Sequence, residues 1–238
     1  MEPVTQILHN LHGGNVLDIA TGSGGFLIDL SNKIPGFKNG VGVDNNPFSI
    51  KTAVKNNQDQ RFSYCLMDAA CLSFHDDEFD VVSISNSLHH MPEVHNTLKE
   101  MLRVVKPGGT VIIQEMMSDS LTETQQTHRD LHHWWAAVDR GCGISHGNTY
   151  SREEIMALIN EVDLINHQII ELSDLESDSL DLELQKTLEP VFSRYFNRLS
   201  TLPDANDLLA QGEALRKRLK TVGLHSATAL YVVANKPG

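Results

Sequence analysis

The sequence predicts a doubly wound α/β fold, in which a mainly parallel seven-stranded sheet carries helices on both faces. Short apolar runs alternate with segments of helical periodicity, and this alternation is typical of parallel sheets. The first apolar run ends in a glycine-rich turn that leads into a helix, Thr21-Gly22-Ser23-Gly24-Gly25. With 238 residues, 40% of them hydrophobic, the chain can build one domain with a substantial core.

The first half of the chain alternates regularly between the two patterns. Strands are expected at 15–20, 40–44, 62–66, 79–85 and 110–114, and helices at 26–32, 47–56 and 93–105. The strand at 79–85 is apolar enough to be buried on both faces. The helix at 93–105 is expected to end at Lys106-Pro107-Gly108-Gly109, because glycine and proline commonly follow a helix terminus.

The second half departs from this regular alternation. A long helix is expected at 121–140, and Ser151-Arg152-Glu153-Glu154 has the capping-box pattern that opens a further helix. Strands are expected at 164–172 and 227–235. The long acidic stretch between these strands is interpreted as a helical insertion, because a structureless loop of that size is unusual inside a compact domain.

Composition argues against several classes of function. The formal net charge of -12 would repel a phosphate backbone, so nucleic acid is not expected as a partner. The three cysteines are odd in number and lack the paired spacing of a zinc site or a disulfide framework. The sequence has no signal-peptide pattern, and no apolar run approaches the ~18 residues needed to span a membrane. We therefore expect a cytoplasmic protein without a membrane partner.

Two features at the predicted strand ends indicate a nucleoside ligand. Ligands of open α/β sheets bind at the carboxyl ends of the strands, and small residues in the first turn let backbone N–H groups approach them. Asp44 ends the second strand, where a carboxylate can accept hydrogen bonds from a ribose diol, although it also suits a strand-end turn. Leu27 replaces the third glycine of a dinucleotide fingerprint, so an NAD-dependent oxidoreductase is the weaker alternative.

Five segments in order resemble the class I S-adenosylmethionine-dependent methyltransferases: VLDIATGSGG, GVGVD, MDAACLSF, FDVVSISNSLHHM and LKEMLRVVKPGGTVII. The Ala20-Thr21-Gly22 form of the turn is most similar to the ubiquinone/menaquinone biosynthesis C-methyltransferases. The resemblance implies a Rossmann-like enzyme that transfers a methyl group from S-adenosylmethionine to a small-molecule acceptor and releases S-adenosylhomocysteine. A non-catalytic regulator that binds S-adenosylmethionine is the alternative from a different class.

The resemblance also implies a set of cofactor-binding residues. Asp44 would hold the ribose, and Asp68 with the Ala69 backbone would meet the adenine edge, although Asp68 also suits a surface turn. The methionine part would be surrounded by Asp18, Ala20, Gly22 and Gly24, and the set is completed by Asn45 and Asn86.

Asn45 stands where many relatives have an apolar residue that packs on the adenine. We therefore expect the adenine to pack on Met67, Leu72 or Phe48 instead.

The histidines after the fourth predicted strand are candidates for a general base. Methyl transfer from a sulfonium is an in-line displacement, so the protein aligns the nucleophile and, where needed, removes a proton. His89 and His90 suit that task near neutral pH, but a histidine capping the following helix explains them equally well. The segment lacks the acidic or asparagine-proline-proline-aromatic motif of amino-group methyltransferases acting on nucleic-acid bases or glutamine.

The predicted helix at 121–140 is the second candidate region. His128, His132, Trp135 and Asp139 recur at steps of four, three and four, so they share one helix face. We predict that this face binds the substrate, with His132 as a further candidate base; a face that only packs on the domain is an equal alternative. No metal site is expected, because no carboxylate-supported triad of histidines is visible in the spacing.

We therefore predict a single methyltransferase domain over residues 1–238. The cofactor half covers about 1–115, and segments at about 117–150 and 173–226 form a cap that excludes water from the methyl group. Substrate choice or the contacts of a homodimer are assigned to the longer second segment. The acceptor itself stays unidentified, because function lies in the site rather than in the fold.

Overall fold

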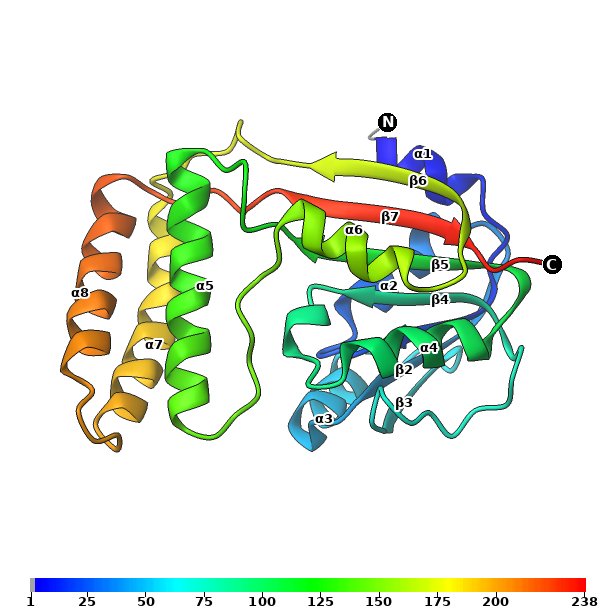
Figure 1. Cartoon of the computed structure of the whole chain (residues 1–238), viewed down its shortest axis with the longest axis horizontal. Helices are drawn as coiled ribbons and strands as arrows, with labels where there is room; N and C mark the ends of the chain where they lie inside the picture. The colour runs from blue at the N-terminus through cyan, green and yellow to red at the C-terminus, as the bar shows by residue number, and fades with distance from the viewer. Residues whose placement is uncertain (1–2) are drawn as a thin grey trace. The chain divides into compact units, whose positions relative to one another are not determined.

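The computed structural model describes residues 3–238 and contains a seven-stranded sheet in the order β3-β2-β1-β4-β5-β7-β6 (Figure 1). The strands are β1 (Gly14–Ile19), β2 (Phe37–Asp44), β3 (Phe62–Leu66), β4 (Phe79–Ser85), β5 (Val105–Met116), β6 (Ile165–Leu172) and β7 (Ala229–Asn235). The four neighbouring pairs from β3 to β5 are parallel. β7 runs opposite to β5, since Met117 bonds to Thr228 at one end and Gly108 to Lys236 at the other. The predicted fold class, a mainly parallel seven-stranded sheet, is confirmed.

Helices connect most of these strands. They are α1 (Pro3–His9), α2 (Gly25–Lys33), α3 (Pro47–Asn56), the short 3-10 helix η1 (Leu88–His90), α4 (Val94–Val104), α5 (Glu123–Gly141), α6 (Arg152–Asn160), α7 (Leu182–Leu199) and α8 (Asn206–Thr221). α3 begins where the sequence predicts, because the Asn46 side chain accepts a bond from the Phe48 N–H and Pro47 occupies the first helical position. No helix within residues 3–238 is both long and apolar enough to cross a membrane.

Two predicted boundaries shift for identifiable reasons. α4 ends at Val104 and β5 begins at the next residue, so the predicted terminator at 106–109 lies inside the strand. The β4 to β5 register shifts between Phe79 and Val81, which leaves those residues as a bulge. α5 begins at Glu123 rather than at 121, because Thr122 and Gln125 form a capping box.

The described residues form two compact units. The sheet unit comprises the residues up to Glu115 together with Glu154–Glu171 and Leu230–Gly238, and the helical unit comprises Met116–Glu153 and Leu172–Ala229. The predicted cap segments at 117–150 and 173–226 fall inside the helical unit. Their role as a cap stays a prediction.

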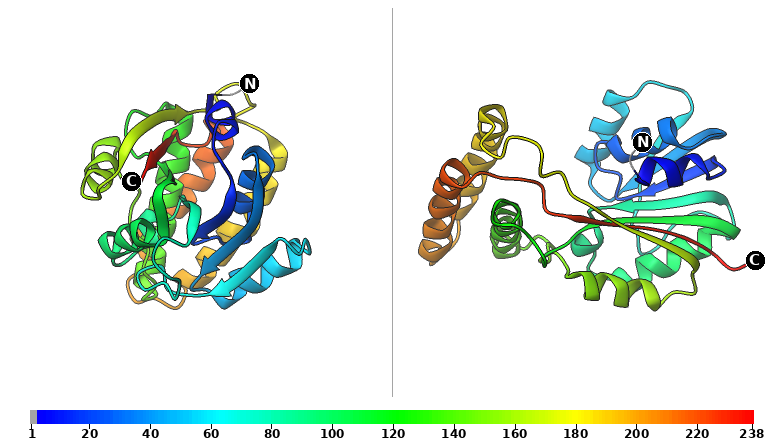
Figure 2. Two further views of the ribbon diagram at one scale, coloured as in Figure 1. Left: turned by 90° about the vertical axis from the view of Figure 1, so that its right-hand side faces the viewer. Right: turned by 90° about the horizontal axis from the view of Figure 1, so that it is seen from above.

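Each unit has its own apolar core. In the sheet unit, Val16, Leu17 and Ile19 of β1 are fully buried, as expected for a central parallel strand. In the helical unit, α5, α7 and α8 lie side by side around Trp134 and Phe192 (Figure 1, Figure 2). The Trp134 indole N–H donates to the Leu208 carbonyl at 2.7 Å, so this large ring is buried without leaving its polar atom unpaired.

Candidate functional site

The turn after β1 has the backbone shape that its sequence predicts. Ala20, Gly22 and Gly24 all have positive φ angles, of 53°, 55° and 84°. A Cβ added at Gly24 would lie 2.7 Å from the Tyr64 hydroxyl, so glycine is required there for close packing. A Cβ at Gly22 would meet no atom of residues 3–238 within 4 Å. The turn is therefore packed on one side and accessible to a ligand at Gly22.

Asp44, at the carboxyl end of β2, is oriented by two backbone groups. The Gly22 N–H donates to its Oδ2 at 2.9 Å, and the Asn46 N–H donates to its Oδ1 at 2.8 Å. Each carboxylate oxygen has two acceptor positions, so both oxygens can still accept a ligand hydroxyl. The bond to Gly22 also links the carboxylate directly to the glycine turn.

Asp18, at the end of β1, is buried beneath the same turn. Its carboxylate accepts hydrogen bonds from the Thr21 hydroxyl at 2.7 Å and the Ser83 hydroxyl at 2.8 Å. Burial raises the pKa of Asp18 to about 6, against the lowering effect of these two bonds, and the nearby charge of Asp44 adds to the rise. Asp18 therefore has a fixed position. Its carboxylate is mostly ionised at pH 7 but takes up a proton more readily than an ordinary aspartate.

The residues expected at the adenine differ in exposure. Asp68 is exposed, and its Oδ1 accepts the Ala70 N–H at 2.9 Å, which is the geometry of the turn alternative. Ala69 and Leu72 are buried, whereas Phe48 is 75% exposed. Phe48 is thus the packing candidate with the most apolar surface available to a ligand.

Leu66, which the sequence analysis did not single out, pairs in register with Asp44 and is 59% exposed. An exposed leucine at the end of a strand, next to the aspartate that ends the neighbouring strand, is the signal that could have found it. Asn45 and Asn86 are both exposed, and Asn86 has a positive φ of 46° while its N–H donates to the Gln114 carbonyl.

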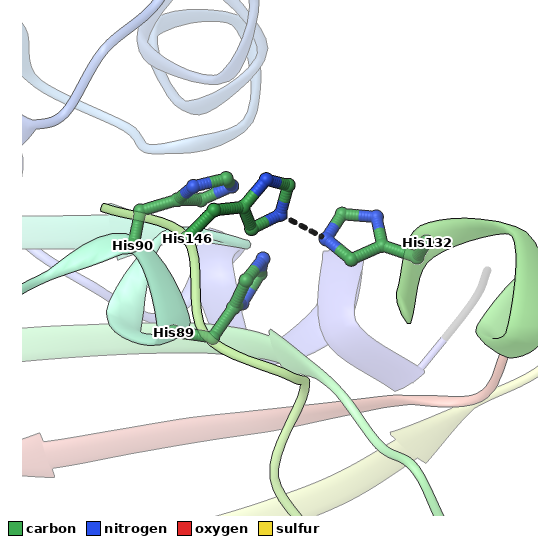
Figure 3. A group of neighbouring side chains, drawn as sticks. All are labelled: His89, His90, His132 and His146. Carbon is green, nitrogen blue, oxygen red and sulfur yellow. Dashed lines mark hydrogen bonds between the residues drawn. The ribbon is translucent and has the colours of Figure 1, made fainter. Parts of the chain in front are cut away.

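His89 and His90 lie on η1, directly after β4, with ring centroids 4.3 Å apart (Figure 3). The Nδ1 atom of His89 is hydrogen-bonded to Oε1 of the buried Glu115 at 2.7 Å, and Oε2 of Glu115 accepts the Leu88 N–H at 2.8 Å. His89 is thus held by a carboxylate from β5. Glu115 escaped the sequence analysis because it lies on another strand, 26 residues away.

In the helical unit, the predicted face of α5 contains residues with different surroundings. His128 accepts the Ala227 N–H at its Nδ1 atom, and burial lowers its pKa. Asp139 is buried and accepts bonds from Tyr195 and Arg198. His132 and Trp135 contact each other edge to face, with ring centroids 5.8 Å apart.

His146 joins this face from the loop that follows α5, and the sequence analysis did not single it out. Its Nδ1 atom is bonded to Asp139 Oδ2 at 2.8 Å, and its Nε2 atom lies 3.1 Å from Nε2 of His132 (Figure 3). The fourteen-residue separation from His132 crosses a loop, so no helical periodicity relates the two histidines.

The fold and the residues around the glycine turn define a doubly wound α/β protein with an oriented carboxylate and an accessible glycine turn at the carboxyl ends of β1 and β2. Residues 2–169 match the family model described as a methyltransferase domain. This chain belongs to that family of S-adenosylmethionine-dependent methyltransferase enzymes.

The chain is similar to several curated proteins of known sequence. It is 31% identical over 175 residues to the uncharacterized protein YafE of Escherichia coli, covering 71% of this chain and 74% of that protein. It is 32% identical over 126 residues to the ubiquinone/menaquinone biosynthesis C-methyltransferase UbiE of a Geobacter species, covering 51% and 52%. The chain thus spans about half the length of this second relative.

Solved structures show the same fold at low sequence identity. A putative methyltransferase from Bacillus halodurans has a TM-score of 0.63 at 18% identity, covering 99% of this chain and 98% of its own. A phosphoethanolamine N-methyltransferase 2 from Haemonchus contortus, in complex with phosphomonomethylethanolamine and S-adenosylhomocysteine, has the same TM-score at 19% identity, covering 99% and 52%. These likenesses concern the fold alone.

Proposed function

We propose that this chain binds S-adenosylmethionine at the carboxyl ends of β1, β2 and β3 and transfers its methyl group to a small-molecule acceptor in the cytoplasm. The observation that carries the proposal is the orientation of Asp44. Two backbone N–H groups hold its carboxylate and leave an acceptor position on each oxygen for the two ribose hydroxyls.

The surroundings of Asp44 suit the other parts of this cofactor. Gly22 gives access to the backbone of the turn, where the methionine part would lie. The exposed apolar side chains of Phe48 and Leu66 offer surface for the adenine ring. Asp18, when ionised, places negative charge beneath the turn, which favours the positively charged sulfonium and ammonium groups. In this proposal Ala20, Gly24, Asn45, Asp68, Ala69 and Asn86 complete the cofactor set.

When bound, the cofactor supplies an electrophilic methyl group to a nucleophile aligned with its sulfur–carbon bond. We assign the removal of a proton from the acceptor to His89. Glu115 holds the Nδ1 atom of this imidazole, so proton transfer falls to Nε2, as in carboxylate-oriented histidine bases. His90 and His132 are the other candidate bases.

We assign the acceptor to the face of α5 that carries His132 and Trp135. His128 and Asp139 were expected on the same face. His128 accepts a hydrogen bond from the Ala227 N–H and Asp139 accepts one from Arg198, so in this proposal they position the surface and do not contact the acceptor.

Calorimetry with S-adenosylmethionine, S-adenosylhomocysteine and NAD tests the cofactor assignment. Asp44→Ala is expected to weaken binding of both sulfur nucleosides by about 10- to 150-fold, because hydrogen bonds to a charged group contribute about 1.5–3 kcal/mol. Asp59→Ala is the matched control, since Asp59 is an exposed aspartate whose side chain pairs with Arg61. Equal binding by the wild type and Asp44→Ala, or a preference for NAD, would overturn the assignment.

Release of S-adenosylhomocysteine in the presence of candidate acceptors tests the transfer itself. Quinols come first in the panel, because one relative bears the name of a quinone-biosynthesis methyltransferase. Sterols and small amines follow, chosen from the names of another relative and of a structural neighbour. Tight cofactor binding with no turnover on any of these classes would favour the regulator over the enzyme.

A further inference from the structure

Both units of the protein contain a histidine whose Nδ1 atom is bonded to a buried carboxylate, with a second histidine beside it. In the sheet unit Glu115 is bonded to His89, and in the helical unit Asp139 is bonded to His146. The second histidines are His90 and His132, and all four imidazoles can offer a ring nitrogen to a metal ion (Figure 3). A carboxylate on the far nitrogen is the usual support of a metal-ligating histidine.

The helical pair has the spacing that two ligands of one ion require. Zinc–nitrogen bonds of about 2.0–2.1 Å in tetrahedral geometry separate two ligand nitrogens by roughly 3.3 Å. The Nε2 atoms of His132 and His146 lie 3.1 Å apart. A hydrogen bond between the rings has a similar length, so a shift of the His132 proton from Nε2 to Nδ1 exposes both lone pairs with little movement.

The hydrogen bonds of Asp139 favour this arrangement. Its Oδ2 atom accepts the Tyr195 hydroxyl at 3.0 Å and is bonded to Nδ1 of His146, while its Oδ1 atom pairs with Arg198. A carboxylate that accepts a hydrogen bond from the Nδ1–H group of His146 leaves Nε2 of this ring as the metal-binding atom.

A second, independent observation indicates a polar ligand at this surface. The indole N–H of Trp135 is buried and has no hydrogen-bond acceptor among residues 3–238. The Trp135 ring lies edge to face with the ring of His132. Buried donors are rarely left unpaired, so a water or a ligand heteroatom beside His132 would account for this indole.

We propose that His132 and His146 bind a Zn²⁺ ion through their Nε2 atoms, with Asp139 orienting His146. Imidazole suits zinc among the transition metals, and a site with two protein ligands keeps coordination positions for water or for an oxygen or nitrogen atom of a bound small molecule. The sequence does not predict this site, because His146 and Asp139 come together only through the loop after α5. This role excludes His132 as a base, because the metal takes the lone pair of its Nε2 atom, but it does not depend on the proposed methyl transfer.

Calorimetric titration of the tag-free, chelator-treated full chain with Zn²⁺ tests the site, and Co²⁺ absorption reports the ligand environment. His132→Ala and His146→Ala are each expected to lower the zinc affinity at least 10-fold, and Asp139→Asn to lower it by about 10–100-fold. His133→Ala is the matched control, because His133 is half-buried on the same helix and its Nε2 atom is bonded to Thr149 instead.

Thermal unfolding by circular dichroism identifies variants that have lost their fold, and His132→Ala, at a half-buried position, serves as the decisive variant if His146→Ala unfolds. Stoichiometric zinc binding that weakens in His132→Ala and persists in His133→Ala supports the proposal. No zinc binding by the wild type, or equal binding by the wild type and His132→Ala, would overturn it, whatever the outcome of the cofactor and acceptor experiments.

Discussion

Replacing Asp18 with asparagine tests the electrostatics beneath the glycine turn. In the folded protein the pKa of Asp18 is raised from 3.8 to about 6, chiefly by burial. Between these two pH values the folded state binds a proton that the unfolded chain has released. Stability therefore falls as the pH rises from about 4 to about 6 and stays level above that, which is the sign expected for a raised acid pKa.

The size of this effect follows from the shift. About two pKa units at 1.36 kcal/mol each correspond to about 3 kcal/mol of stability lost by the wild type across this window. Asparagine does not titrate, and it can still accept a hydrogen bond from Thr21 or Ser83. The stability of Asp18→Asn relative to wild type should thus rise by about 3 kcal/mol between about pH 4 and about pH 7.

Urea unfolding followed by circular dichroism at several pH values measures this difference. The informative quantity is its change with pH, because any constant effect of the amide cancels. A difference that is flat across the window, within about 1 kcal/mol, would refute the reasoning and show that Asp18 keeps an ordinary pKa. Titration of the Asp18 carboxyl carbon by NMR provides a direct check.

Three glycine substitutions, one of them a control, test the packing of the units by urea unfolding. Gly24→Ala should lower stability by about 1–3 kcal/mol, because the residue has a φ of 84° and its Cβ would lie 2.7 Å from the Tyr64 hydroxyl. Gly25→Ala, which meets no neighbour within 4 Å and begins α2, should leave stability unchanged or raise it by up to about 1 kcal/mol. Gly212→Ala should destabilise the helical unit by about 1–3 kcal/mol, because its Cβ would lie 2.3 Å from the Trp134 ring. Equal stability of Gly24→Ala and Gly25→Ala, or no effect at Gly212, would contradict the packing described.

The strands of the cofactor half could be predicted closely because their evidence is local. A buried parallel strand is a short apolar run, as in the strand at 79–85, and its boundaries there agree with the structure. The boundaries at 106–109 could not be predicted, because the bulge in β5 depends on its register against β4. The same proline and glycine residues can end a helix or form a bulge in a strand, so the local sequence does not distinguish these two structures.

The sequence by itself determined the fold class, the glycine turn and the aspartate at the end of β2, because strand periodicity and turn chemistry depend on residues close together in the chain. Only the tertiary structure decided which partners the buried polar groups take. Glu115 meets His89 across 26 residues, and Asp139 meets Arg198 across 59. Such pairs form wherever the folded backbone brings two side chains within hydrogen-bonding distance, and no local pattern records that distance.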